Sequence, residues 1–227
     1  MPQPDLVIFD CDGVLVDSEV IAARVDAELI TRAGFPIEAE EVAERFAGLT
    51  FHDILLEVEK LSAIPLQASL IDEERKLLDN RLAKEVRGID GAREAVARVQ
   101  APRCICSNST PDRLEMMLTK TGLRPLFGDH IFSARAIPDA RPKPAPDVFI
   151  HAAKAMNAAP AHTFVIEDSV HGVHAARAAG MRVIGFTGAS HSYPGHADRL
   201  MEAGAETVIR RHADLQAVLD ALSEWAE

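Results

Sequence analysis

The sequence has 227 residues, which suits one domain of moderate size or one domain that carries an insertion. Hydrophobic residues make up 48% of the chain and charged residues 26%, so the composition is that of a globular protein and excludes intrinsic disorder. The net charge of −11 makes nucleic acid and anionic membranes poor partners, whereas a small anionic substrate is still allowed.

The first apolar run covers residues 6–9, and four consecutive apolar residues are typical of a strand buried on both faces. From about residue 18 to residue 84 the pattern is helical only. After that, apolar runs alternate with helical patterns. The expected strands are residues 103–106, 163–166, 182–186 and 206–209, and the expected helices are residues 113–120, 147–156, 170–179, 196–203 and 215–225.

These patterns predict an α/β fold, in which a Rossmann-like parallel sheet has helices on both faces and a small all-α cap is inserted after the first strand. The core would comprise residues 1–16 and 85–227, and the cap residues 17–84. The N-terminus shows no secretory signal, and no apolar run approaches the ~20 residues of a membrane span. Cys11, Cys104 and Cys106 are too sparse for a disulfide framework. We therefore expect a cytoplasmic protein, as a monomer or a weak homodimer.

Acidic residues follow two of the expected strands. Asp10 and Asp12 come after the first strand, and Glu167 and Asp168 come after the strand at residues 163–166. The carboxyl ends of parallel strands line the binding crevice of an open sheet, and clustered carboxylates there suit Mg²⁺. A single Asp at a strand end more often caps a turn, but two clusters on two strands favour a metal site.

Polar residues that suit an anion follow two other elements. Ser107 and Asn108 come after the strand at residues 103–106, although Ser109 or Thr110 could simply cap the next helix. Lys143 lies between prolines that stiffen its loop, although most lysines are solvated surface charges. Together with the acidic clusters, these residues indicate a site for a metal and a phosphate.

Four motifs in order resemble those of the haloacid dehalogenase-like hydrolase superfamily, and the resemblance spans the whole chain. The motifs are Asp-x-Asp-Gly-Val-Leu-x-Asp-Ser at residues 10–18, Ser107 with Asn108, Lys-Pro-x-Pro at residues 143–146, and Glu-Asp-Ser-x-x-Gly at residues 167–172. The helical insertion resembles the cap of the β-phosphoglucomutase-like and phosphoglycolate phosphatase-like branch. Within that branch the sequence is most similar to 6-phosphogluconate phosphatase-like and sugar-alcohol phosphatase-like members.

The resemblance implies a Mg²⁺-dependent phosphatase that hydrolyses a small sugar, sugar-acid or polyol phosphate. Asp10 would be the nucleophile that forms an aspartyl-phosphate, and Asp12 the general acid and base. Mg²⁺ would be bound by Asp10, the main-chain carbonyl of Asp12 and Asp168, with Glu167 as a further ligand or as a support for the ligands. The phosphoryl oxygens would be held by Ser107, Asn108 and Lys143.

Two alternatives stay open. A β-phosphoglucomutase-like phosphomutase has a cap histidine where this chain has Ala22, and basic residues in the cap loop that matches the neutral residues 46–51. A non-catalytic protein that only binds a phosphorylated ligand would not need Asp10 beside Asp12. The loop at residues 188–195 has no role that the motifs assign, and Glu19 could face the substrate, solvent or the core.

Overall fold

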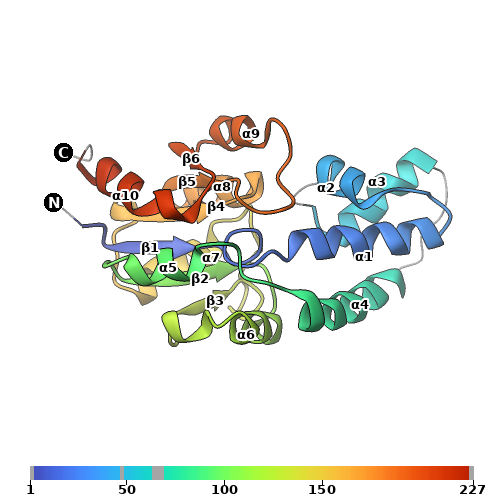
Figure 1. Cartoon of the computed structure of the whole chain (residues 1–227), viewed down its shortest axis with the longest axis horizontal. Coiled ribbons are helices and arrows are strands. Elements are labelled where there is room, and N and C mark those ends of the chain that lie inside the picture. Colours follow the sequence, from blue (N-terminus) through green and yellow to red (C-terminus); the bar gives the residue numbers. More distant parts are fainter. Residues whose placement is uncertain (1–2, 47–48, 63–68, 225–227) are drawn as a thin grey trace.

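The structure is a computed structural model and describes residues 3–46, 49–62 and 69–224. Six parallel strands form one sheet in the order β3-β2-β1-β4-β5-β6 (Figure 1). Their bounds are Leu6–Phe9 (β1), Arg103–Ser107 (β2), Ile131–Ser133 (β3), Thr163–Glu167 (β4), Arg182–Phe186 (β5) and Thr207–Ile209 (β6). The predicted Rossmann-like parallel sheet is confirmed, and β1 lies in its middle.

Helices cover both faces of the sheet, because side chains along each strand alternate between two buried clusters. Val7 and Phe9 of β1 face α5 (Ala92–Arg98), α6 (Pro111–Lys120) and α10 (Leu215–Glu224). Leu6 and Ile8 face α7 (Asp147–Ala155), α8 (Val170–Ala178) and α9 (His196–Glu202). Short 3₁₀ helices lie at Arg124–Leu126, Pro160–His162 and His212–Asp214.

Four of the five helices that separate β1 from β2 in the sequence lie to one side of the sheet (Figure 1). They are α1 (Glu19–Arg32), α2 (Ala39–Arg45), α3 (Phe51–Ser62) and α4 (Ser69–Glu85). Val25 and Leu29 of α1 share a buried cluster with Leu78 and Leu82 of α4, so α1 supplies the apolar face on which the others pack. We propose that residues 17–84 form a cap domain on the core of residues 1–16 and 85–227.

One strand of the sheet, β3, and one of the helices that cover it, α5, were not expected from the sequence. The edge strand β3 has only three residues, two of them partly exposed, and such a short run has no clear pattern. Helix α5 has seven residues, and its left-handed N-cap Gly91 (φ 76°) precedes a stretch rich in alanine. The expected end of the last helix, residue 225, lies outside the described residues.

Cys11, Cys104 and Cys106 are all buried and free, as the sequence suggested. Within the described part of the chain, no helix has the length and apolar character to cross a bilayer.

Candidate active site

The candidate site lies at the carboxyl edge of the sheet, around the end of β1. Phe9 pairs with Ile105 of β2 and with Ile166 of β4, so the residues that follow these strands meet at one edge. The N–H of Asp10 donates to the carbonyl of Ile166 (3.0 Å). The chain leaves β1 toward the cap here, and neighbouring β4 lies on the opposite side from β2, which is where an open α/β sheet forms its binding crevice.

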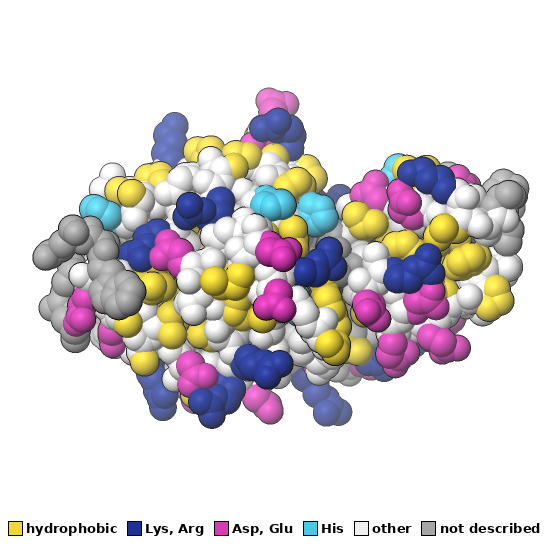
Figure 2. All heavy atoms as spheres, turned by 90° about the horizontal axis from the view of Figure 1, so that it is seen from above, with side chains coloured by type: hydrophobic (Ala, Val, Ile, Leu, Met, Phe, Trp, Pro, Cys, Tyr) yellow, Lys and Arg dark blue, Asp and Glu magenta, His cyan; other side chains and the backbone are white. Residues whose placement is uncertain are grey.

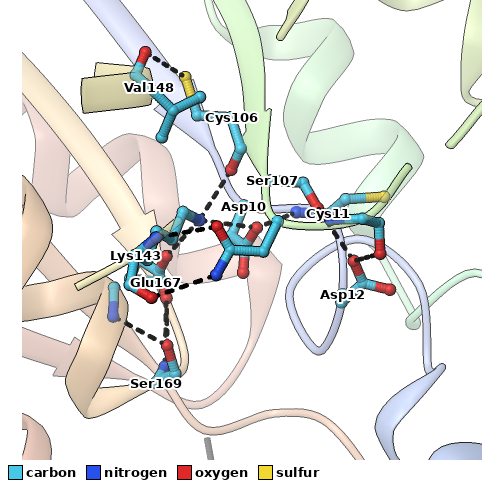
Figure 3. Close-up of polar contacts among 12 residues, drawn as sticks. Asp10, Cys11, Asp12, Cys106, Ser107, Lys143, Val148, Glu167 and Ser169 are labelled. Carbon is cyan, nitrogen blue, oxygen red and sulfur yellow. Dashed lines mark hydrogen bonds and ion pairs between the residues drawn. The ribbon is translucent and has the colours of Figure 1, made fainter. Parts of the chain in front are cut away.

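Lys143 joins two of the carboxylates that were predicted from the sequence (Figure 3). Its Nζ lies 2.9 Å from Oδ1 of Asp10 and 2.6 Å from Oε1 of Glu167, and it donates to the carbonyl of Cys106 (2.8 Å). The lysine side chain is only 4% exposed, so this is a buried network and not a surface ion pair.

Burial and crowding of like charges shift the pKa values of this network. Burial raises the pKa of Asp10 well above its usual range, the carboxylate of Glu167 raises it further, and Lys143 opposes both. The pKa of Glu167 is raised chiefly by burial. Burial alone would lower the pKa of Lys143, but Asp10 and Glu167 outweigh it and raise this pKa. The two carboxylates therefore hold the lysine in its charged form.

Asp12 points away from Lys143 and accepts hydrogen bonds from three hydroxyl groups. Ser18 Oγ donates to Oδ1 (2.7 Å), and Ser107 Oγ (3.1 Å) and Ser109 Oγ (2.8 Å) donate to Oδ2. Ser18 precedes the first cap helix, whereas Ser107 and Ser109 follow β2. The carboxylate of Asp12 is thus held in one orientation between core and cap.

Asn108 supports the lysine loop. Its Oδ1 accepts from the N–H of Lys143 (2.9 Å), and its Nδ2 donates to the carbonyl of the same residue (3.4 Å). The predicted role of Asn108 toward phosphoryl oxygens stays a prediction. Thr110, not Ser109, caps α6, since its side chain accepts from the N–H of Arg113 (3.4 Å). The hydroxyl of Ser109 is therefore available to donate to Asp12.

The start of α8 fixes Glu167. Ser169 caps this helix through Gly172 N–H (3.0 Å), and it also donates to Glu167 Oε2 from both its N–H (3.2 Å) and its Oγ (3.1 Å). A Cβ on Gly172 would lie 1.9 Å from the carboxylate carbon of Glu167, so only glycine leaves room for this side chain. Both oxygens of Glu167 are consequently engaged, one with Lys143 and one with Ser169.

Asp10, Glu167 and Asp168 are the one group of candidate metal ligands among the described residues. One carboxylate oxygen from each lies within 4.8 Å of the others, and all three residues are buried. Three hard oxygen donors that repel one another suit a divalent cation such as Mg²⁺. The carboxylate of Asp12 is outside this group, and a contribution from its main-chain carbonyl stays a prediction.

The loop at residues 188–195 also reaches the site, which the motifs did not indicate. His191 Nε2 lies 3.0 Å from Oδ2 of Asp168, and His196 Nε2 lies 2.7 Å from the carbonyl oxygen of the same residue. The loop follows β5, so the strand-end argument that identified the other residues could have identified this one too.

Glu19 is the first residue of α1 and follows Ser18, which bonds Asp12. Burial raises its pKa to about 7, an effect opposed by His191 and reinforced by the nearby carboxylates of Asp12 and Asp168. Three of the groups that act on it, His191, Asp12 and Asp168, belong to the candidate site, so the half-buried Glu19 lies near that site. Figure 2 shows a notch between the core and the helical insertion on this side of the molecule, with histidine side chains beside it.

Comparison with known proteins agrees with this geometry. The family model described as haloacid dehalogenase-like hydrolase matches residues 4–180. The 6-phosphogluconate phosphatase of Escherichia coli is 33% identical over 199 residues, which are 86% of this chain and 87% of that protein. Hexitol phosphatase B of Escherichia coli is 31% identical over 196 residues, with 78% of this chain and 81% of that protein covered.

A solved structure is also similar. A conserved haloacid dehalogenase-like protein of unknown function from Agrobacterium tumefaciens superposes with a TM-score of 0.92 and 60% sequence identity, and the match covers 96% of this chain and 99% of that one. The family model matches well over half of the sequence. The order of the parallel strands brings the four motifs together in one site. This chain therefore belongs to the haloacid dehalogenase-like hydrolases.

Proposed function

We propose that this protein is a Mg²⁺-dependent phosphatase that hydrolyses a small sugar, sugar-acid or polyol phosphate through an aspartyl-phosphate on Asp10. The chain is a phosphomonoesterase of its family, and the substrate class follows from its similarity to a 6-phosphogluconate phosphatase and a hexitol phosphatase. The observation that carries the proposal is the buried carboxylate Asp10, paired with Lys143 and two residues away from a second carboxylate on Asp12.

In the first half-reaction, a carboxylate oxygen of Asp10 attacks phosphorus and the bond from phosphorus to the ester oxygen breaks. The contacts of Oδ1 with Lys143 and with the N–H of Cys11 (2.8 Å) fix the carboxylate and leave Oδ2 for the attack. Asp12, protonated in the substrate complex, gives its proton to the departing alcohol oxygen and becomes a carboxylate. Its three hydroxyl partners keep it at one position beside Asp10.

In the second half-reaction, Asp12 takes a proton from a water molecule as that water attacks the phosphorus of the aspartyl-phosphate. Inorganic phosphate leaves and Asp10 is regenerated as a carboxylate. Both reactants at phosphorus are negatively charged, so the reaction depends on groups that offset this charge. Lys143 supplies one positive charge, and Ser107 is a donor for the phosphoryl oxygens once its hydroxyl turns away from Asp12.

Asp10, Asp168 and the main-chain carbonyl of Asp12 would hold Mg²⁺, with Glu167 as a further ligand or a support. The ion supplies Lewis-acid stabilisation of the phosphoryl oxygens. Glu167 already has one oxygen on Lys143 and the other on Ser169, which favours the supporting role.

The test is release of inorganic phosphate from a panel of sugar, sugar-acid and polyol phosphates, with Mg²⁺ and with a chelator. We expect release with Mg²⁺ only, and a loss of at least ~10³-fold in Asp10→Asn, because the amide is a poor nucleophile. Asp5→Asn, an exposed change at the other end of β1, serves as the matched control and should leave the rate unchanged.

Two other outcomes would replace the proposal. Isomerised sugar phosphate in the presence of a bisphosphate primer, without net phosphate release, would identify a phosphomutase. Residues 47 and 48 of the cap loop that bears on that alternative lie outside the described residues. Ligand binding by both wild type and Asp10→Asn, without turnover by either, would identify a non-catalytic binding protein.

A further inference from the structure

The loop at residues 188–195 connects the candidate metal site to the start of the cap. The N–H of Ser190 donates to Oδ1 of Asp17 (3.1 Å), and its hydroxyl donates to Oδ2 of the same carboxylate. The next residue, His191, contacts Asp168 through Nε2 (3.0 Å). One short loop therefore contacts both the first residue of the insertion and a predicted metal ligand.

The side chain of His191 is closely packed against its neighbours. Its side chain is only 10% exposed, and its ring packs edge-to-face on His196 at 5.7 Å between centroids. A Cβ on Gly13 would lie 2.8 Å from Cε1 of His191 and 1.9 Å from Oδ2 of Asp168. The imidazole and the carboxylate thus lie together against the turn that follows Asp12, where only glycine leaves room for them.

His196 holds the main chain of Asp168. A carbonyl oxygen can only accept, so Nε2 of His196 carries the proton and donates to Asp168 (2.7 Å), while Nδ1 accepts from Ser192 Oγ (3.3 Å). Tyr193 stacks on the same ring at 4.8 Å between centroids. The backbone of Asp168 is therefore already fixed by His196, and His191 acts on its carboxylate alone.

A histidine at residue 191 stabilises the fold less than an apolar residue of similar size would. Its Nδ1 is buried and has no hydrogen-bond partner among the residues that the structure describes. An unpaired buried polar atom opposes folding, and an apolar side chain would fill the same space without that penalty. The polar contact that remains, from Nε2 to Asp168, is the interaction of this side chain with the described residues that an apolar residue could not supply.

We propose that His191 is a positioning residue, which donates from Nε2 to Oδ2 of Asp168 and so keeps the other carboxylate oxygen directed at the cation site formed with Asp10 and Glu167. This inference rests on the proposed function, since it requires that Asp168 binds the metal. Carboxylates that bind metals are themselves commonly held by such hydrogen bonds, and removing one typically costs about 10–100-fold in metal affinity or activity.

The experiment compares His191→Leu and His191→Gln with the parent, using the full chain freed of metal. Free Mn²⁺ is counted by electron paramagnetic resonance during a titration with Mn²⁺ alone, so no turnover is involved. The Mg²⁺ concentration for half-maximal phosphate release is measured separately. The Gln side chain can place an amide N–H near the position of Nε2, whereas Leu cannot donate. His174→Leu, an exposed change on α8, is the matched control.

We expect His191→Leu to bind Mn²⁺ about 10–100-fold more weakly and to need correspondingly more Mg²⁺, with the KM of the phosphate ester at saturating Mg²⁺ within about 2-fold of the parent. His191→Gln should recover most of the loss, and His174→Leu should match the parent. If His191→Leu does not fold, as judged by its melting curve, His191→Asn replaces it, because the shorter amide cannot reach Asp168.

Unchanged or tighter Mn²⁺ binding by His191→Leu would overturn the inference, and so would a glutamine variant as weak as the leucine variant. These outcomes leave the proposed function intact, because the parent still binds the metal and releases phosphate. A parent that binds no Mn²⁺ and releases phosphate without Mg²⁺ would contradict the metal in the proposed function, and the inference with it.

Discussion

Lys143 illustrates at the scale of one residue why this site needs both signs of charge. Two carboxylates at 2.9 and 2.6 Å from Nζ would repel each other strongly in a buried setting without a cation between them. A lysine in the same place without them would lose its proton. The pairing keeps all three groups in place before substrate arrives, so little rearrangement is required when the phosphoryl group binds.

Glu19 should make stability depend on pH in a defined direction. Burial raises its pKa from 4.5 to about 7, so between these values the folded protein binds the proton more tightly than the unfolded chain does. Stability is therefore lost as the pH rises through this window. The side chain of Glu19→Gln cannot ionise. The free energy of unfolding of this variant should therefore rise relative to that of the parent between pH 4.5 and 7. The rise of this pKa from 4.5 to about 7 limits the gain to about 3 kcal/mol, and partial exposure keeps it smaller.

Urea unfolding of the metal-free protein at pH 5, 6, 7 and 8 measures this difference. Glu28→Gln, an exposed change on the same helix, should show a constant difference from the parent over the same range. A constant difference for Glu19→Gln as well would mean that its carboxylate titrates near its ordinary pKa and does not face the site.

The sequence predicts which residues belong to the candidate site better than it predicts the contacts that these residues make. Asp10, Ser107 and Glu167 all follow strands, and parallel pairing alone brings them to one edge. That Asn108 would hold the main chain of Lys143, and that Asp12 would take three hydroxyl partners, could not be predicted. Those contacts depend on side-chain directions across loops, where no periodic pattern applies.

At the scale of one element, the first turn of α8 requires glycine at Gly172, because the Glu167 carboxylate occupies the space that a side chain would need. Alanine normally stabilises a helix interior by roughly 1 kcal/mol relative to glycine. At Gly172, however, the added Cβ would lie 1.9 Å from the Glu167 carboxylate. Gly172→Ala should therefore displace Glu167 from Lys143, lower stability by about 1–3 kcal/mol and reduce phosphate release.

Gly88→Ala is the matched control, because a Cβ there would meet its nearest neighbours at 3.8 and 3.9 Å, which is ordinary contact. Chemical denaturation and phosphate release should both be near the parent values for this variant. A Gly172→Ala protein as stable as the parent would show that Glu167 can move aside at little cost, and that its ion pair with Lys143 is loose.

The same element scale separates what patterns can predict from what they cannot. Strands β1, β4 and β5 are continuous apolar runs, and their predicted limits agree with the structure to within one residue. The edge strand β3 has no such run, since an edge strand of three residues is only partly buried. The loop after β5 has no periodicity. Its position after a strand could have placed it at this edge of the sheet, but the contact of His191 with Asp168 depends on tertiary packing.

At the scale of the whole molecule, core and cap are joined around the site by polar contacts as well as by the chain. Arg113 of α6 pairs with Asp79 of α4 (2.8 Å), and Lys120 donates to the carbonyl of Lys84 (3.0 Å). The acidic partner Asp79 is half exposed, and such pairs contribute little stability. Weak contacts of this kind would let the proposed cap open and close over a substrate without disturbing the core.

Mg²⁺ should stabilise the whole protein through the acidic site. A ligand at 100 times its Kd adds about 2.7 kcal/mol to the free energy of unfolding. For a chain of this size that corresponds to roughly 5–10 °C in melting temperature. Because burial and Glu167 raise the pKa of Asp10, protons compete with the metal in acid, and the shift should be smaller at pH 5 than at pH 8.

Melting curves with excess Mg²⁺ and with a chelator, at both pH values, measure this effect. Asp168→Asn should lose most of the shift, because one of the three clustered carboxylates is gone. Asp220→Asn, on α10 at the opposite edge of the sheet, should keep it. A shift of equal size in Asp168→Asn would place the stabilising ion elsewhere on this acidic chain, and the carboxylates at the end of β1 and β4 would then need another explanation for their proximity.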